Sequence, residues 1–162
     1  MIDKELNKIT KMLDKYLSKK FDCECCGLDT DFYCYPDTKE VFYSLTFVAD
    51  NDKYFNNLFK MLGLKYNADS FILALYHEIG HCMTWEHFTR AEMFFIKVMK
   101  KIIDNGKPNK IKRMIYPFLL DEFKATQWAC NYINKHPQEV QRMWQNIQPK
   151  ILKFYTDNGL TN

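Results

Sequence analysis

A five-residue segment, His77-Glu78-Ile79-Gly80-His81, sets the strongest condition on the local structure of this chain. It follows the apolar run 71–76. Helical residues four apart lie one above the other, so a helix here would direct both imidazoles at one metal ion. Glu78 lies about 100° around that helix from His77, where it can take a proton from a water activated by the metal. The pattern has three fixed residues and also suits an ordinary helix without a metal, so the flanking sequence must supply further evidence.

The composition predicts one globular domain spanning residues 1–162. The chain is 47% hydrophobic and 16% aromatic, which favours a full core and argues against disorder. A net charge of +3 is too small to imply a nucleic-acid partner by itself. The N-terminal segment lacks the apolar region of a secretory signal, and no apolar run approaches the roughly 18 residues of a membrane span. We therefore expect a cytoplasmic protein without a membrane partner, unless it is exported without a cleaved signal.

Six cysteines need an explanation in a compartment that keeps thiols reduced. Two of them, Cys82 and Cys130, fall on predicted helices and fit as small core residues. The other four are crowded and resemble half of a structural zinc site, but they lack a second matching C-x2-C pair. Free or buried thiols are the favoured interpretation, with a metal site or disulfide chemistry as alternatives. The four are Cys23, Cys25, Cys26 and Cys34.

The remaining pattern predicts a mostly helical α+β fold with a small antiparallel β-hairpin or sheet near the N-terminus. Residues 2–20 follow the three-four spacing of an amphipathic helix, whose apolar face suits core packing better than a dimer seam. Residues 31–35 and 41–48 are rich in aromatic and β-branched residues around a turn at 36–39. Five further helices are predicted: 52–62, one beginning at Asp69 or Ser70, 88–103, 117–135, and 138–158, which Pro149 should kink or split.

A catalytic zinc normally has three protein ligands and one open position, so a third ligand must be found. Glu122 is the favoured candidate, because it falls on an apolar helical stripe where a carboxylate is costly unless it is paired or binds a metal. Small residues at Ala125, Ala129 and Gly80 would let the two helices approach closely. The alternative is a glutamate at the edge of the stripe that is salt-bridged or reaches water. The stripe comprises Phe118, Glu122, Ala125, Ala129 and Tyr132.

His87 is the second candidate, because it follows His81 at the spacing of metzincin peptidases. That arrangement requires a sharp turn at Thr84, where those peptidases have glycine and where a β-branched residue is poorly suited to a positive φ. A continuing helix would direct His87 about 120° away from His81. We therefore expect His87 to be a surface histidine or an outer neighbour of the site.

The two motifs together resemble a known family. His77–His81, followed about forty residues later by Glu122-x-x-Ala125-x-x-Trp128-Ala129, is similar to the minimal gluzincins, among them the intracellular zincin-like peptidases related to ImmA/IrrE and small phage zincins. The resemblance covers about residues 30–135 and implies a zincin-like fold. It also implies a zinc ion (Zn2+) held by His77, His81 and Glu122. The chain departs from the family at Thr126, where an acid or amide that supports a histidine ligand is common.

These observations predict a zinc-dependent metallopeptidase acting on a protein or peptide substrate, with Glu78 as general base. The resemblance implies that an edge strand of the hairpin holds the substrate in an extended form. The oxyanion donor is open among Tyr76, Tyr116, His136 and Tyr155. The alternative is a non-catalytic zinc-binding regulatory protein on the same scaffold. A basic run over 97–113 lacks interleaved aromatic residues, so a solvated helix end and loop is favoured over a nucleic-acid site.

Overall fold

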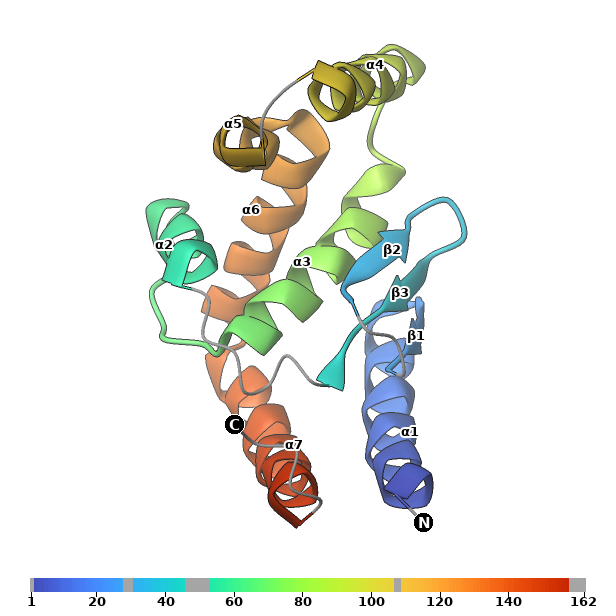
Figure 1. Ribbon diagram of the computed structural model, residues 1–162, viewed down its shortest axis with the longest axis vertical. Coiled ribbons are helices and arrows are strands. Elements are labelled where there is room, and N and C mark those ends of the chain that lie inside the picture. Colours follow the sequence, from blue (N-terminus) through green and yellow to red (C-terminus); the bar gives the residue numbers. More distant parts are fainter. Residues whose placement is uncertain (1, 28–30, 46–52, 107–108, 158–162) are drawn as a thin grey trace.

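The computed structural model describes residues 2–27, 31–45, 53–106 and 109–157, and its centre is a pair of helices. Helix α3 (Ser70–Trp85) and helix α6 (Leu120–Lys135) run side by side in the middle of the molecule (Figure 1). All residues of α3 from Ser70 to His77 are buried. A helix that is apolar on every side must be covered on every side, so the other elements pack around it. Helix α3 begins directly after Asp69, as predicted.

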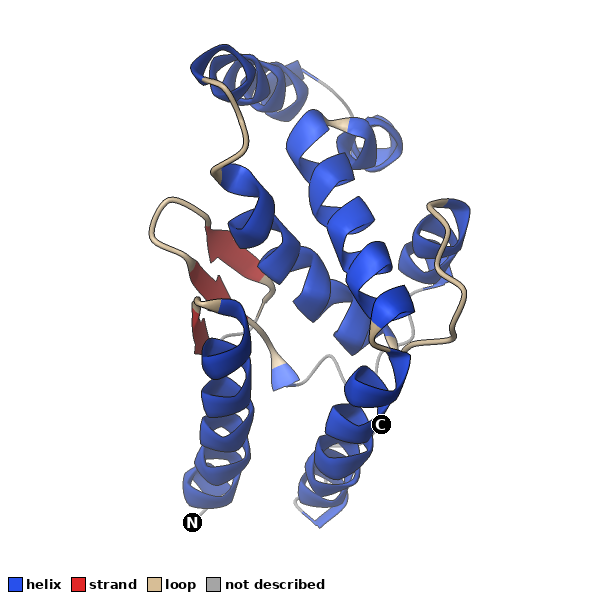
Figure 2. Cartoon of the chain, turned by 180° about the vertical axis from the view of Figure 1, so that it is seen from behind, coloured by secondary structure: helices blue, strands red, loops and turns tan. Residues whose placement is uncertain are grey.

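The other helices extend the molecule in two directions (Figures 1 and 2). Helices α1 (Ile2–Phe21) and α7 (Pro137–Asp157) project at one end, and α4 (Arg90–Gly106) and α5 (Asn109–Ile115) lie at the other. Helix α2 (Lys53–Met61) flanks the central pair. Among the described residues, no helix is long and apolar enough to cross a membrane.

Two predicted helices differ from the observed ones. The helix expected from Pro117 begins at Leu120, because Pro117 lies in a 3-10 turn, η2 (Tyr116–Phe118). Phe118 is therefore not part of the α6 stripe, and its side chain is 59% exposed. Pro149 was predicted to kink or split the last helix, and α7 is not split, since it continues through Pro149 to Asp157. Pro149 removes one backbone hydrogen bond, and the buried apolar face of α7 offsets that loss.

The sheet has three short strands in the order β1-β3-β2. Strands β2 (Tyr33–Tyr35) and β3 (Glu40–Phe42) form the predicted antiparallel hairpin, with Cys34 opposite Val41. Strand β1 (Glu24–Cys26) pairs with β3 in parallel, so the prediction of a purely antiparallel sheet is wrong. The fold is α+β and mostly helical, as expected. Strand β1, which was not predicted from the sequence, lies within the cysteine cluster.

The strand predicted over 41–48 is shorter than expected. It ends at Phe42, and residues 46–48 lie outside the described part of the chain. Val41, Tyr43 and Leu45 are buried, but Ser44 between them is also buried, because the chain leaves the sheet after Phe42. The alternation that marks a strand is therefore lost at this point.

The turn of the hairpin is fastened to the end of α3. Trp85 Nε1 donates a hydrogen bond to Asp37 Oδ1 at 2.5 Å, and Lys39 Nζ lies 2.9 Å from Glu86 Oε1. These contacts hold the hairpin beside the C-terminal half of α3, which carries the histidines.

Candidate metal centre

Two histidines and one glutamate converge between the central helices. His77 and His81 lie one turn apart on α3, and their Nε2 atoms are 3.2 Å apart. Glu122, in the first turn of α6, places Oε2 3.1 Å from His77 Nε2 and 3.4 Å from His81 Nε2. All three residues are buried. The structure therefore brings together the three residues predicted as metal ligands.

A close helix–helix approach makes this convergence possible. Gly80 faces Ala125, and a Cβ added at position 80 would overlap the Ala125 carbonyl oxygen. Ala125 and Ala129 are fully buried at the same contact. The small residues expected to allow close packing are therefore at the contact, and they bring Glu122 within reach of the histidines.

The geometry of the three ligand atoms fits a tetrahedral metal ion. Corners of a tetrahedron with bonds of about 2.0–2.1 Å lie about 3.3–3.4 Å apart, and the observed separations are 3.1, 3.2 and 3.4 Å. Three corners leave a fourth open. Within the described residues, no other group of three or more His, Cys, Asp or Glu side chains converges in this way.

No protein-family model, curated protein or solved structure matches this chain. The chemistry of the site must therefore be inferred from its own side chains.

The ionisable groups of the site are coupled to one another. Burial by itself would raise the pKa of Glu122, but hydrogen bonds with His77 and His81 outweigh it and hold that pKa far below its ordinary value. Burial by itself would lower the pKa of His77, but the hydrogen bond to Glu122 outweighs it and the pKa is raised. The two shifts favour an anionic Glu122 beside a protonated His77, and a bound metal ion would take the place of that proton.

Thr126 orients His77. Its hydroxyl donates to the Glu122 carbonyl oxygen at 2.9 Å, and its oxygen lies 3.0 Å from His77 Nδ1. A hydroxyl has one proton, so Thr126 Oγ1 accepts from Nδ1–H, and the Nε2 lone pair is left for a metal. Thr126 therefore gives His77 an acceptor, although its hydroxyl carries no negative charge.

Lys100 of α4 was missed by the sequence prediction. Its Nζ donates to Glu122 Oε1 at 2.7 Å and lies 2.5 Å from Asp121 Oδ2. Burial would lower the pKa of Lys100, but these two carboxylates outweigh it and raise the pKa. The basic run over 97–113 was predicted to be a solvated helix end and loop. The predicted loop instead contains helix α5, and among the described side chains Lys100 and Lys112 are half-buried. The position of Lys100 between buried Ile96 and Ile103 at helical spacing was the available signal.

A cleft of about 400 Å³ opens beside the ligands. Glu78, half-buried on α3, lines this cleft together with His81 and Glu122. Strand β2 supplies Tyr33 and Cys34 to the opposite wall. The predicted base, two of the ligands and an edge strand thus share one cavity.

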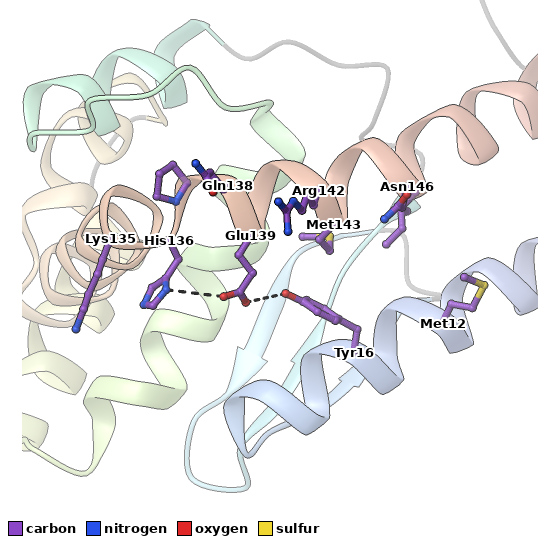
Figure 3. Close-up of a pocket in the computed structure, with 11 residues that line it drawn as sticks. Met12, Tyr16, Lys135, His136, Gln138, Glu139, Arg142, Met143 and Asn146 are labelled. Atoms are coloured by element: carbon purple, nitrogen blue, oxygen red, sulfur yellow. Dashed lines mark hydrogen bonds and ion pairs between the residues drawn. The ribbon is translucent and has the colours of Figure 1, made fainter.

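Of the four predicted oxyanion donors, Tyr116 lines the cleft. Its ring centroid lies 5.2 Å from Lys100 Nζ. Tyr76 is buried, Tyr155 belongs to the buried face of α7, and His136 lies near Glu139. Figure 3 shows the larger hollow that contains His136, about 840 Å³ between α1 and α7. That hollow contributes none of the three ligands.

Two other sets of candidates lie outside the ligand group. His87 is exposed beyond the end of α3 at Trp85. All six cysteines are free thiols, and Cys82 and Cys130 are buried in the core as predicted. Three of the crowded four divide between two places, and Cys26 is half-buried on β1. Cys23 and Cys25 meet in the core with their Sγ atoms 3.6 Å apart, whereas Cys34 lies at the cleft, where contacts with Cys82 and burial raise its pKa.

Proposed function

We propose that this protein is a zinc-dependent metallopeptidase in which His77, His81 and Glu122 hold the metal and Glu78 is the general base. The observation that carries the proposal is the tetrahedral spacing of the three buried ligand atoms at a cleft that Glu78 also lines. Two imidazoles and one carboxylate form a common ligand set of catalytic zinc, with the fourth position open. The resemblance of both sequence motifs to the minimal gluzincins supports the same assignment.

Zinc bound there would polarise the scissile carbonyl and lower the pKa of the attacking water. The Glu78 carboxylate takes one proton from this water as the oxygen forms a bond to the carbonyl carbon. Glu78 then gives the proton to the amide nitrogen as the carbon–nitrogen bond breaks, so that a carboxylic acid and an amine leave. Thr126 and Lys100 hold His77 and Glu122 in place, and Tyr116 is positioned at the cleft to donate to the developing oxyanion.

The wall of the cleft supports a peptide as the substrate. Strand β2 pairs with β3 along one edge, and among the described strands its other edge has no partner. An extended peptide can add to such an edge through its backbone, and α3 lies next to β2 at the cleft. A peptide in this position would cross the cleft beside Glu78.

The decisive experiment is metal content combined with peptide cleavage. We expect about one zinc per chain in the purified protein, loss of zinc in His77→Ala and Glu122→Ala, and retention in the matched control His87→Ala. Glu78→Gln should keep its zinc and lose at least about 100-fold in the cleavage rate of a peptide library, because only the proton acceptor is removed.

Two results would contradict the proposal. A native protein purified without zinc, and unable to take it up, would dismiss the metal centre. A zinc-loaded protein that cleaves no peptide or protein substrate would instead support a non-catalytic zinc-binding protein.

A further inference from the structure

Helix α4 has two apolar faces. Ile96 and Ile103 are buried on its inner face, where Lys100 reaches the metal centre. On its outer face, four large apolar side chains are open to solvent, and we call them the outer stripe: Phe94 (71% exposed), Phe95 (55%), Val98 (37%) and Ile102 (54%).

The outer stripe is a continuous surface. At about 100° per residue, its four members fall within a sector about 100° wide that points away from Ile96. Single exposed apolar residues are normal on a protein surface, but a contiguous group of them marks a surface that binds another protein or a membrane. Helices α4 and α5 lie at the end of the molecule opposite α1 and α7 (Figures 1 and 2), and Met114 and Phe118 are also exposed near this end.

Positive charges run along one side of the stripe. Arg90, Lys97 and Lys101 are exposed on α4, and within the described residues none of them forms an ion pair. The two nearby acids have partners. Glu92 accepts hydrogen bonds from Thr89, and Asp104 lies 3.9 Å from Lys112 Nζ. The outer face of α4 is therefore apolar beside three unpaired cations, and the exposed carboxylate of Asp104 already has Lys112 as its partner.

We propose that the outer stripe lies in the interface of an anionic lipid bilayer, with its apolar side chains among the acyl chains and its cations at the headgroups. An apolar helical face beside Lys and Arg is the pattern of helices that lie in a membrane surface. Such a helix rests on the bilayer and does not span it.

The charge pattern favours lipid over two other occupants. A second copy of this chain would bring the same unpaired cations against each other, because a two-fold contact pairs identical surfaces. A protein partner would need a groove that fits one convex helix and that has acidic residues along its rim. A fluid bilayer covers a convex apolar stripe without matched shape, and anionic headgroups balance Arg90, Lys97 and Lys101.

The lipid surface is inferred independently of the metallopeptidase proposal, since none of the four stripe residues is a ligand or the base. The inner face of α4 lines the cleft through Ile96 and Lys100, and Lys97 lies at the rim between the cleft and the outer stripe. A membrane under the outer face would therefore bring the cleft close to the lipid surface. If both proposals hold, membrane-associated polypeptides become the expected substrates.

Vesicle sedimentation tests the proposal. The purified protein is mixed with vesicles of phosphatidylcholine containing phosphatidylserine, or of phosphatidylcholine alone, over a range of salt. We expect binding to the anionic vesicles that falls as salt rises. Phe94→Ser/Phe95→Ser and Lys97→Glu/Lys101→Glu should each weaken binding at least about 10-fold. The control Lys11→Glu/Lys15→Glu changes the net charge equally on the exposed face of α1 and should bind like the native protein.

Several outcomes would overturn the inference. Absence of binding to anionic vesicles is one, and so is binding lost in the α1 control but kept in the Phe94→Ser/Phe95→Ser variant. A dimer in light scattering that dissociates in that phenylalanine variant would assign the stripe to a second copy instead. The substituted side chains are all solvent-exposed, and circular dichroism of each variant confirms that the fold is kept. Because cleavage is not measured, failure here is distinct from failure of the metallopeptidase proposal.

Discussion

Lys100 binds one carboxylate oxygen of Glu122 and leaves the other oxygen for His77. Lys100 Nζ donates to Oε1 at 2.7 Å, which leaves Oε2 directed at His77 Nε2, 3.1 Å away. A carboxylate held in this way offers one oxygen to a metal ion. Helix α4 thus contributes to a site whose ligands come from α3 and α6.

Lys100→Met should weaken zinc binding by about 10- to 100-fold, the usual effect of removing a residue that orients a metal ligand. Competition with a chromophoric chelator measures the affinity. Lys97→Met is the matched control, because Lys97 lies one turn earlier on the rim of the same cleft and should change the affinity little. Equal zinc affinity in both variants would show that Lys100 does not orient Glu122.

Thr126→Val should also lower zinc affinity by about 10- to 100-fold, because His77 Nδ1–H loses its acceptor. Valine has nearly the same shape as threonine, so the loss reports the hydroxyl and not the packing. Thr126→Ser keeps the hydroxyl and should restore most of the affinity. The same chelator competition applies, and an unchanged affinity in the valine variant would remove Thr126 from the site.

Gly80→Ala should destabilise the fold by about 1–3 kcal/mol, because the added Cβ overlaps the Ala125 carbonyl and the central helices must separate. Alanine has the higher intrinsic helix propensity, by about 1 kcal/mol, so local preference predicts the opposite sign. Urea unfolding of the metal-free protein gives the difference. Asn131→Ala, at an exposed position of α6, is the control and should be neutral or slightly stabilising. A more stable Gly80→Ala variant would contradict the close approach.

Asp14→Asn should change how stability depends on pH. Burial raises the pKa of Asp14 from 3.8 to about 6, although hydrogen bonds from Tyr43 and the Gly27 backbone oppose the shift. The folded state therefore holds this proton more tightly than the unfolded chain, so its contribution is full below about pH 4 and is lost as pH rises toward 6. Asparagine does not titrate, so the variant should gain stability relative to the native protein across this window and keep the gain above it. Urea midpoints at pH 4.5 and 7 measure the effect, and a constant difference between the two proteins would refute it.

Periodicity along the chain accounts for much of the fold and of the candidate site. The apolar run before His77 and the four-residue spacing of the histidines predict α3, and an acid on an apolar stripe predicts Glu122 as the partner. Both signals can be read within one helix. A helix repeats its faces every three to four residues, so an acid that falls on the apolar face stands out and must have a partner. The same rule applied to α4 would have found Lys100, which lies between two buried isoleucines.

Other features depend on contacts between distant segments, which no local period records. Strand β1 is too short for an alternation to stand out, and its parallel pairing with β3 is decided by the packing of the chain after α1. The same holds for the acceptor of His77. Thr126 lies 49 residues away and takes part only because α3 and α6 pack with Gly80 against Ala125. The sequence by itself determined which three residues form the candidate metal site. The tertiary structure decided which side chains hold them in place, because those partners meet only when separate helices are packed.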